Sequence, residues 1–109
     1  MPELNLGIAA FDRQDYDEAL RLLMPIAHQG NAEAQTIIGN LYHLGLGVKQ
    51  NLDEAATWYH HASRQGYGLA SSNLAGIELQ KGNRVEAERL FNLARQQGFE
   101  HAPISANYL

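Results

Sequence analysis

The sequence contains no cysteine, and this absence excludes several kinds of chemistry at once. Without thiols the chain has no disulfide framework, no cysteine nucleophile and no cysteine-ligated metal site. Proline occurs only at positions 2, 25 and 103, and no stretch shows sustained alternation of apolar and polar residues. We therefore expect no β-strand.

Basic residues are also in short supply, because eight Lys and Arg face twelve Asp and Glu, which gives a net charge of −4. A protein that neutralises many phosphates needs the opposite balance, so the charge argues against nucleic acid as a partner. No apolar run approaches the roughly 18 residues that a membrane span requires. The N-terminus has neither a basic start nor an apolar segment, so we expect no secretory signal and a cytoplasmic protein by default. A mature periplasmic domain would look the same.

What the 109 residues do contain is an internal repeat. Their content of 45% hydrophobic and 18% charged residues is that of one ordinary folded domain. Three landmarks recur at intervals of 36 and then 32 residues, and such periods are the signature of a helical repeat. The landmarks are Glu18-Ala19, Glu54-Ala55 and Glu86-Ala87; Gln29-Gly30, Gln65-Gly66 and Gln97-Gly98; and Ala34, Ala70 and Ala102.

Each unit has the start and stop signals of two helices. Asp15, Asn51 and Asn83 are suited to cap the second helices, with a glutamate three residues later that can reach back to the cap's own N–H. The glycine of each Gln-Gly pair can adopt the left-handed conformation that ends a helix. These signals predict second helices at 16–28, 52–65 and 84–97, and first helices at 3–13, 32–44 and 68–81.

Small residues recur where two helices must approach closely. Gly7, Gly39 and Ala75 share one repeat position, and we expect Ala19, Ala55 and Ala87 to face them, beside bulky core residues such as Leu23, Tyr59 and Phe91. The chain therefore forms one domain, 1–109, with units at 3–30, 31–66 and 67–98. The segment 99–109 is expected to cap the last unit by burying Ile104, Tyr108 or Leu109.

The middle unit resembles the Sel-one-like repeat, a relative of the tetratricopeptide repeat. Its characteristic residues are Ile38-Gly39, Tyr42, Gly45-Leu46-Gly47-Val48, Trp58-Tyr59 and Gln65-Gly66. The flanking units are shorter by four residues in the loop between their helices, as in ordinary tetratricopeptide units. The resemblance extends over residues 3–102. It implies an all-α fold, a right-handed superhelix of about three antiparallel helix pairs, and a scaffold that binds other proteins in bacterial signalling, secretion or envelope processes.

No group of residues supports catalysis, a metal or another cofactor. The adjacent His60 and His61 point about 100° apart on a helix, and the remaining histidines are scattered without metal-ligand spacing. The acidic cluster Asp12–Glu18 is better explained by helix capping than by acid–base chemistry. The Gly45-x-Gly47 loop lies between helices and is no dinucleotide turn. We expect no enzyme, and we expect Trp58-Tyr59 to belong to the core.

The resemblance also implies a binding face, because first helices line the concave side of such arrays. The expected partner-binding residues are Asp12, Glu33, Thr36, Asn40, His43, Ser72 and Gln80. Asn40 can bond a peptide backbone as donor and acceptor, or it is simply a solvated residue. Ile8, Phe11 and Leu79 form an apolar floor, or the first two pack only at the N-terminal end. The main hypothesis is a module that holds a protein or peptide partner as a monomer. The alternative is a structural protein that self-associates through its repeat ends.

Overall fold

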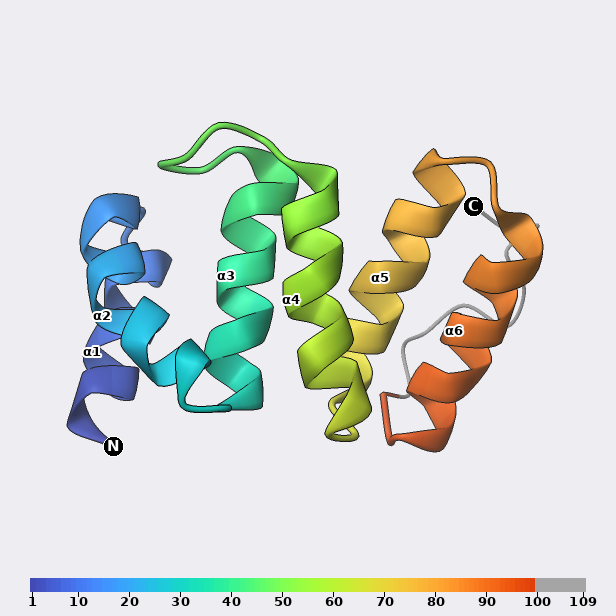
Figure 1. The fold of residues 1–109 in the computed structure, drawn as a ribbon. Helices are drawn as coiled ribbons and strands as arrows, with labels where there is room; N and C mark the ends of the chain where they lie inside the picture. The colour runs from blue at the N-terminus through green and yellow to red at the C-terminus, as the bar shows by residue number, and fades with distance from the viewer. Residues whose placement is uncertain (100–109) are drawn as a thin grey trace.

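Six helices occupy the part of the chain that the computed structural model describes, residues 1–99, and no strand occurs there. They are α1 (Pro2–Asp12), α2 (Tyr16–His28), α3 (Ala32–Leu44), α4 (Leu52–Arg64), α5 (Gly68–Gln80) and α6 (Arg84–Gln96). Each packs against the next along the chain, so three helix pairs follow one another in a row (Figure 1). The predicted all-α repeat fold is confirmed. The predicted capping residues Ile104, Tyr108 and Leu109 lie outside the described residues.

Two of the three predicted N-terminal caps form. The Asp15 carboxylate accepts a bond from the Glu18 N–H at 3.4 Å, and the Asn51 side chain accepts one from the Glu54 N–H at 3.0 Å. The prediction for Asn83 is wrong. Its amide instead donates to the Glu78 carboxylate at 2.7 Å, because that partner lies at the end of the preceding helix.

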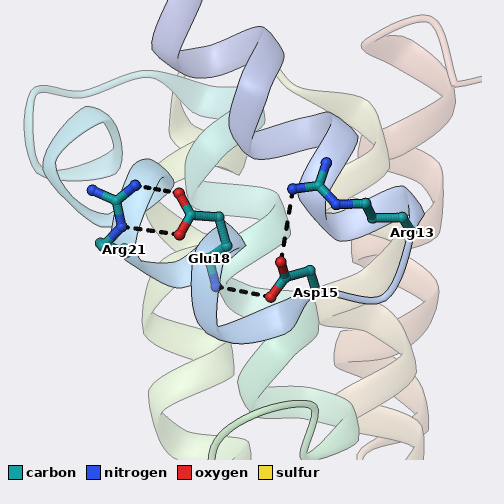
Figure 2. A network of polar contacts seen from close by, with 4 residues as sticks. All are labelled: Arg13, Asp15, Glu18 and Arg21. Atoms are coloured by element: carbon teal, nitrogen blue, oxygen red, sulfur yellow. Dashed lines mark hydrogen bonds and ion pairs between the residues drawn. The ribbon is translucent and has the colours of Figure 1, made fainter.

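The expected reach of the glutamates back to the cap residues is also wrong. The Glu18 carboxylate accepts two bonds from the Arg21 guanidinium, which holds the pKa of Glu18 below its usual range (Figure 2). The Asp15 N–H donates to the carbonyl of Ala10 at 2.8 Å instead. Glu18 therefore bonds to a charged partner one helical turn ahead and not to the Asp15 N–H. That N–H already has an acceptor in the preceding helix.

Close approach of the two helices in a unit depends on glycine, as the repeat position predicts. A Cβ built on Gly7 would lie 2.4 Å from the Leu23 side chain, and one on Gly39 would lie 2.5 Å from the Tyr59 ring. The atoms nearest to the added Cβ thus belong to the bulky core residues Leu23 and Tyr59. They do not belong to the alanines that were expected to face the glycines, such as Ala55. Ala55 is fully buried in the same apolar core as Tyr59.

A glutamine side chain joins consecutive units at the same backbone carbonyl of the earlier unit, although the two glutamines come from different positions in their units. The Gln35 amide, which is nearly fully buried, donates to the carbonyl of Ala27 at 3.1 Å and accepts from Gln65 at 2.9 Å. One unit later the Gln97 amide donates to the carbonyl of Ser63 at 3.0 Å. Ala27 and Ser63 are 36 residues apart, so both seams use the same backbone carbonyl. The Gln-Gly landmark therefore has a structural role at the joints between units.

Candidate partner-binding groove

A cavity of about 250 Å³ lies among the first helices of all three units, where the family resemblance places the binding face. We call it the first-helix groove. Residues of α1, of α3 and of the start of α5, with the preceding Tyr67, form it. They are Ile8, Phe11, Asp12, Glu33, Thr36, Ile37, Asn40, Tyr67 and Leu69. The structure thus brings together four of the seven predicted binding residues and two of the three predicted floor residues.

The floor of the groove is apolar and well supported. Ile37 is 9% exposed, and Ile8 and Phe11 are half-buried. The Phe11 ring packs edge-on against Tyr16 with ring centroids 5.8 Å apart, which holds its position from behind. Leu69 is 37% exposed, so it offers apolar surface to an incoming molecule. The floor is therefore preformed and does not need a partner to order it.

Asn40 is half-buried and is already engaged within the protein, so the expectation that it is exposed is wrong. Its side-chain oxygen accepts from the Tyr59 hydroxyl at 2.6 Å and from the Asn73 amide at 3.2 Å. In this arrangement the amide oxygen faces both donors. The Asn40 nitrogen, in contrast, has no hydrogen-bond acceptor within the described residues. Two N–H donors consequently remain at the groove wall.

Thr36 differs from expectation in a similar way. It is 2% exposed, and its hydroxyl donates to the carbonyl of Ala32 in its own helix at 2.8 Å. Since the hydroxyl is used inside α3, Thr36 has no free hydroxyl to offer a partner. It lines the groove as part of the wall and not as a recognition group.

His43 lies outside the groove and belongs to a network that supports it. Its Nδ1 is 3.2 Å from the Tyr59 hydroxyl, and its Nε2 is 3.0 Å from the side-chain oxygen of Gln80. Tyr59 itself is fully buried, and burial raises the pKa of its hydroxyl. Asn40, His43 and Gln80 are therefore connected through the Tyr59 hydroxyl, but His43, Gln80 and the half-buried Ser72 do not line the groove.

Two carboxylates give the groove its electrostatic character. Asp12 is exposed and Glu33 is half-buried, and neither forms an ion pair with a Lys or Arg of residues 1–99. Burial, and next the negative charge of Glu33, raise the pKa of the Tyr67 hydroxyl. Arg13, the cation next to Asp12 in sequence, is 3.7 Å from Asp15 instead (Figure 2).

Sequence reasoning missed three groove residues, namely Ile37, Tyr67 and Leu69. Ile37 carries an ordinary core signal, and nothing in the helical spacing separates it from neighbouring core residues. Tyr67 and Leu69 lie at the junction between units, where Tyr67 is the residue that precedes α5. Helical spacing identifies the outward face of a helix, but it does not indicate which residues at its start contact the neighbouring unit.

A second cavity, of about 420 Å³, lies among α4, α5 and α6. Its acidic residues have partners within the protein, because Glu86 bonds to Arg89 and Glu78 bonds to Asn83. No group of three or more potential ligands within residues 1–99 is arranged to hold a metal ion. Trp58 is buried as predicted, at 8% exposure. None of the helices in this part of the chain has the length and apolar character that crossing a bilayer requires.

The fold and groove define a class of protein, the helical repeat solenoids, whose units stack through shared apolar and polar seams. The sequence model of the Sel1 repeat matches residues 32–67 and 67–99. The chain therefore belongs to the Sel1 repeat family. Sel1 repeats generally mediate protein–protein interaction and are generally not enzymatic.

Relatives of known name or structure agree with this assignment. Protein sel-1 homolog 2 of Mus musculus is 33% identical over 96 residues, and the Rattus norvegicus protein of that name is 32% identical; each match covers 82% of this chain. The Sel1 repeat protein of Oxalobacter formigenes superposes with a TM-score of 0.78 at 36% identity over 86% of this chain. The protective antigen c5321 of uropathogenic Escherichia coli, described as displaying an SLR fold, gives 0.77 at 30% identity over 88%.

This chain is much shorter than those proteins. It spans 14% of the length of the two curated relatives, and 40% and 22% of the two solved chains.

Proposed function

We propose that this chain is an interaction module that holds a segment of another protein in the first-helix groove. The observation that carries the proposal is a preformed apolar floor shared by three units and bordered by hydrogen-bonding and charged groups without partners inside the protein. Ligand sites commonly combine an apolar lining with a few polar groups that fix orientation. The finer setting, a scaffold in bacterial signalling, secretion or envelope processes, is proposed from the family resemblance and from the two bacterial structures.

The test uses a residue that lines the groove without supporting the core. Leu69→Asp places a charge at the exposed part of the floor, and Arg64→Ala changes an exposed residue of α4 outside the groove. Immobilised variants are compared for capture of proteins from a native extract, followed by titration of the captured partner. We expect Leu69→Asp to weaken binding at least tenfold, which is about 1.4 kcal/mol, and Arg64→Ala to bind normally. The reverse result would place the binding surface elsewhere.

A second candidate, self-association through a repeat end, has one observation in its favour. Leu6 of α1 is 57% exposed and Met1 is 59% exposed, so apolar side chains protrude from the first helix. If copies stack there, light scattering should show concentration-dependent growth in mass that Leu6→Glu abolishes. A monomer at all concentrations would exclude this candidate for the isolated chain.

A further inference from the structure

The groove has the charge and donor pattern of a site for a basic peptide. We propose that its occupant is an extended peptide segment in which an arginine or lysine adjoins a large apolar side chain. This inference rests on the proposed function and specifies the chemistry of the partner. It is carried by three features of the groove, which are its unpaired carboxylates, its free amide donors and its apolar floor.

The carboxylates come first, because they place two negative charges at the groove with no cation of the described residues paired to them. Glu33 is half-buried, and an ionised carboxylate that is partly removed from water is stabilised by a nearby positive charge. None of the residues that line the groove is a Lys or Arg, and no cation of the described chain forms an ion pair with Glu33 or Asp12. The helix dipole at the start of α3 stabilises Glu33 in part, and a basic side chain of a bound partner would add the positive charge that the groove itself does not supply. An acidic partner would meet repulsion at the same place.

Two carboxylates at one groove suit a guanidinium or ammonium group on a flexible stem. Asp12 belongs to the end of α1 and Glu33 to the start of α3, so the pair approaches the groove from two helices. Arginine can present two parallel N–H groups to one carboxylate, which gives it an advantage over lysine at such a site. The Tyr67 hydroxyl, which feels the charge of Glu33, is a further group that can accept from the same side chain.

The neutral part of the groove selects for a peptide over a small free cation. The Asn40 nitrogen offers two N–H donors, which suit a backbone carbonyl of an extended segment. Beside it, Ile37, Phe11 and Leu69 form apolar surface that a leucine-sized or aromatic side chain can cover. A polyamine or a metal ion uses the carboxylates alone. A peptide with adjacent basic and apolar residues uses all three features.

The probes are arrayed ten-residue peptides with a central Arg-Leu or Arg-Phe pair and varied flanks. The same peptides are made with citrulline, which keeps the shape of arginine and removes its charge, and with glutamate. The strongest ligand is resynthesised with fluorescein, and its Kd is measured by anisotropy. The protein variants are Glu33→Gln and Asp12→Asn in the groove. Glu88→Gln, which makes the same change at an exposed position in α6, is the matched control.

We expect the citrulline peptide to bind at least tenfold more weakly than the arginine peptide, and the glutamate peptide to bind more weakly still. Glu33→Gln should raise the Kd about tenfold, which is about 1.4 kcal/mol, while Glu88→Gln changes it less than twofold. Raising the ionic strength from about 0.05 to about 0.5 M should weaken the arginine peptide and leave the citrulline peptide nearly unchanged.

Equal binding of arginine and citrulline peptides, or equal effects of Glu33→Gln and Glu88→Gln, would overturn the inference. Leu69→Asp separates this failure from failure of the proposed function. If the peptides bind without charge preference but lose binding with Leu69→Asp, the groove binds peptides and only the charge assignment is wrong. If no peptide binds in a way that depends on Leu69, both are wrong.

Discussion

Gly39→Ala adds one methyl group to α3 where the Tyr59 ring of α4 packs against it. The new carbon would be 2.5 Å from Cε1 and 2.6 Å from Cδ1 of Tyr59. That ring cannot easily move aside, because it is fully buried and its hydroxyl is held by Asn40 at 2.6 Å and by His43 at 3.2 Å. Relief requires the two helices to separate, which disturbs the core of the middle unit.

The magnitude follows from two opposing effects. Overpacking in a rigid core costs about 1–3 kcal/mol, and the short distances place Gly39→Ala near 3 kcal/mol. Alanine is the better helix former by about 1 kcal/mol, so the net loss in the free energy of unfolding is about 2 kcal/mol. Gly76 provides the matched control, because it also lies within a helix and a Cβ there meets nothing within 4 Å. Gly76→Ala should therefore stabilise the protein by about 1 kcal/mol.

The assay is thermal and urea unfolding followed by circular dichroism at the helical band. A difference of about 3 kcal/mol between the two variants corresponds to a separation of about 12 to 24 °C in Tm for a domain of this size. If Gly39→Ala and Gly76→Ala melt within a few degrees of each other, the close packing of α3 on Tyr59 is refuted.

Three further predictions concern the same region. Ala55→Leu should lower the free energy of unfolding by roughly 1–3 kcal/mol, because Ala55 is fully buried; a neutral effect in urea unfolding would contradict this. The double change Asn40→Ala and His43→Ala should lower stability by about 1–3 kcal/mol, because it removes two of the hydrogen-bond partners of the buried Tyr59 hydroxyl; an unchanged Tm would refute it. Burial raises the pKa of Tyr59 above its ordinary value near 10, so the unfolded chain loses this proton first as the pH rises. Stability should be fully present below about pH 10 and fall above it, by up to about 1.4 kcal/mol per pH unit from this group; Tyr59→Phe should show a correspondingly shallower decline, and equal slopes would argue against the assignment.

The helices could be predicted closely because their signals are local. Gly30, Gly66 and Gly98 all have positive φ, as their place after each second helix predicted, and helix ends differ from expectation by one residue at most. The failures arise where a partner comes from another element. Whether Asn83 caps α6 depends on Glu78 at the end of α5, and helix propensity carries no information about that competition.

The binding residues were predicted less well for the same physical reason. Helical spacing correctly placed Asn40 toward the other first helices, but it could not show that Tyr59 and Asn73 already occupy its oxygen. It likewise could not join Tyr67 to Glu33, because the two come together only when consecutive units pack. Periodicity within a helix identifies its faces, whereas the contents of a groove depend on the distance between units.

The seam between units has a consequence for how such an array can grow. In both seams the later unit supplies a donor glutamine, Gln35 or Gln97, and the earlier unit supplies a backbone carbonyl, of Ala27 or Ser63. In the second seam the Ser63 hydroxyl also lies 2.6 Å from the hydroxyl of Ser71. A carbonyl is present whatever side chain stands at that position. A duplicated unit therefore brings the donor of this bond with it and finds an acceptor in the unit it joins, so this part of the joint survives a change in repeat number by gene duplication. The connection also has a direction, which orders the units head to tail.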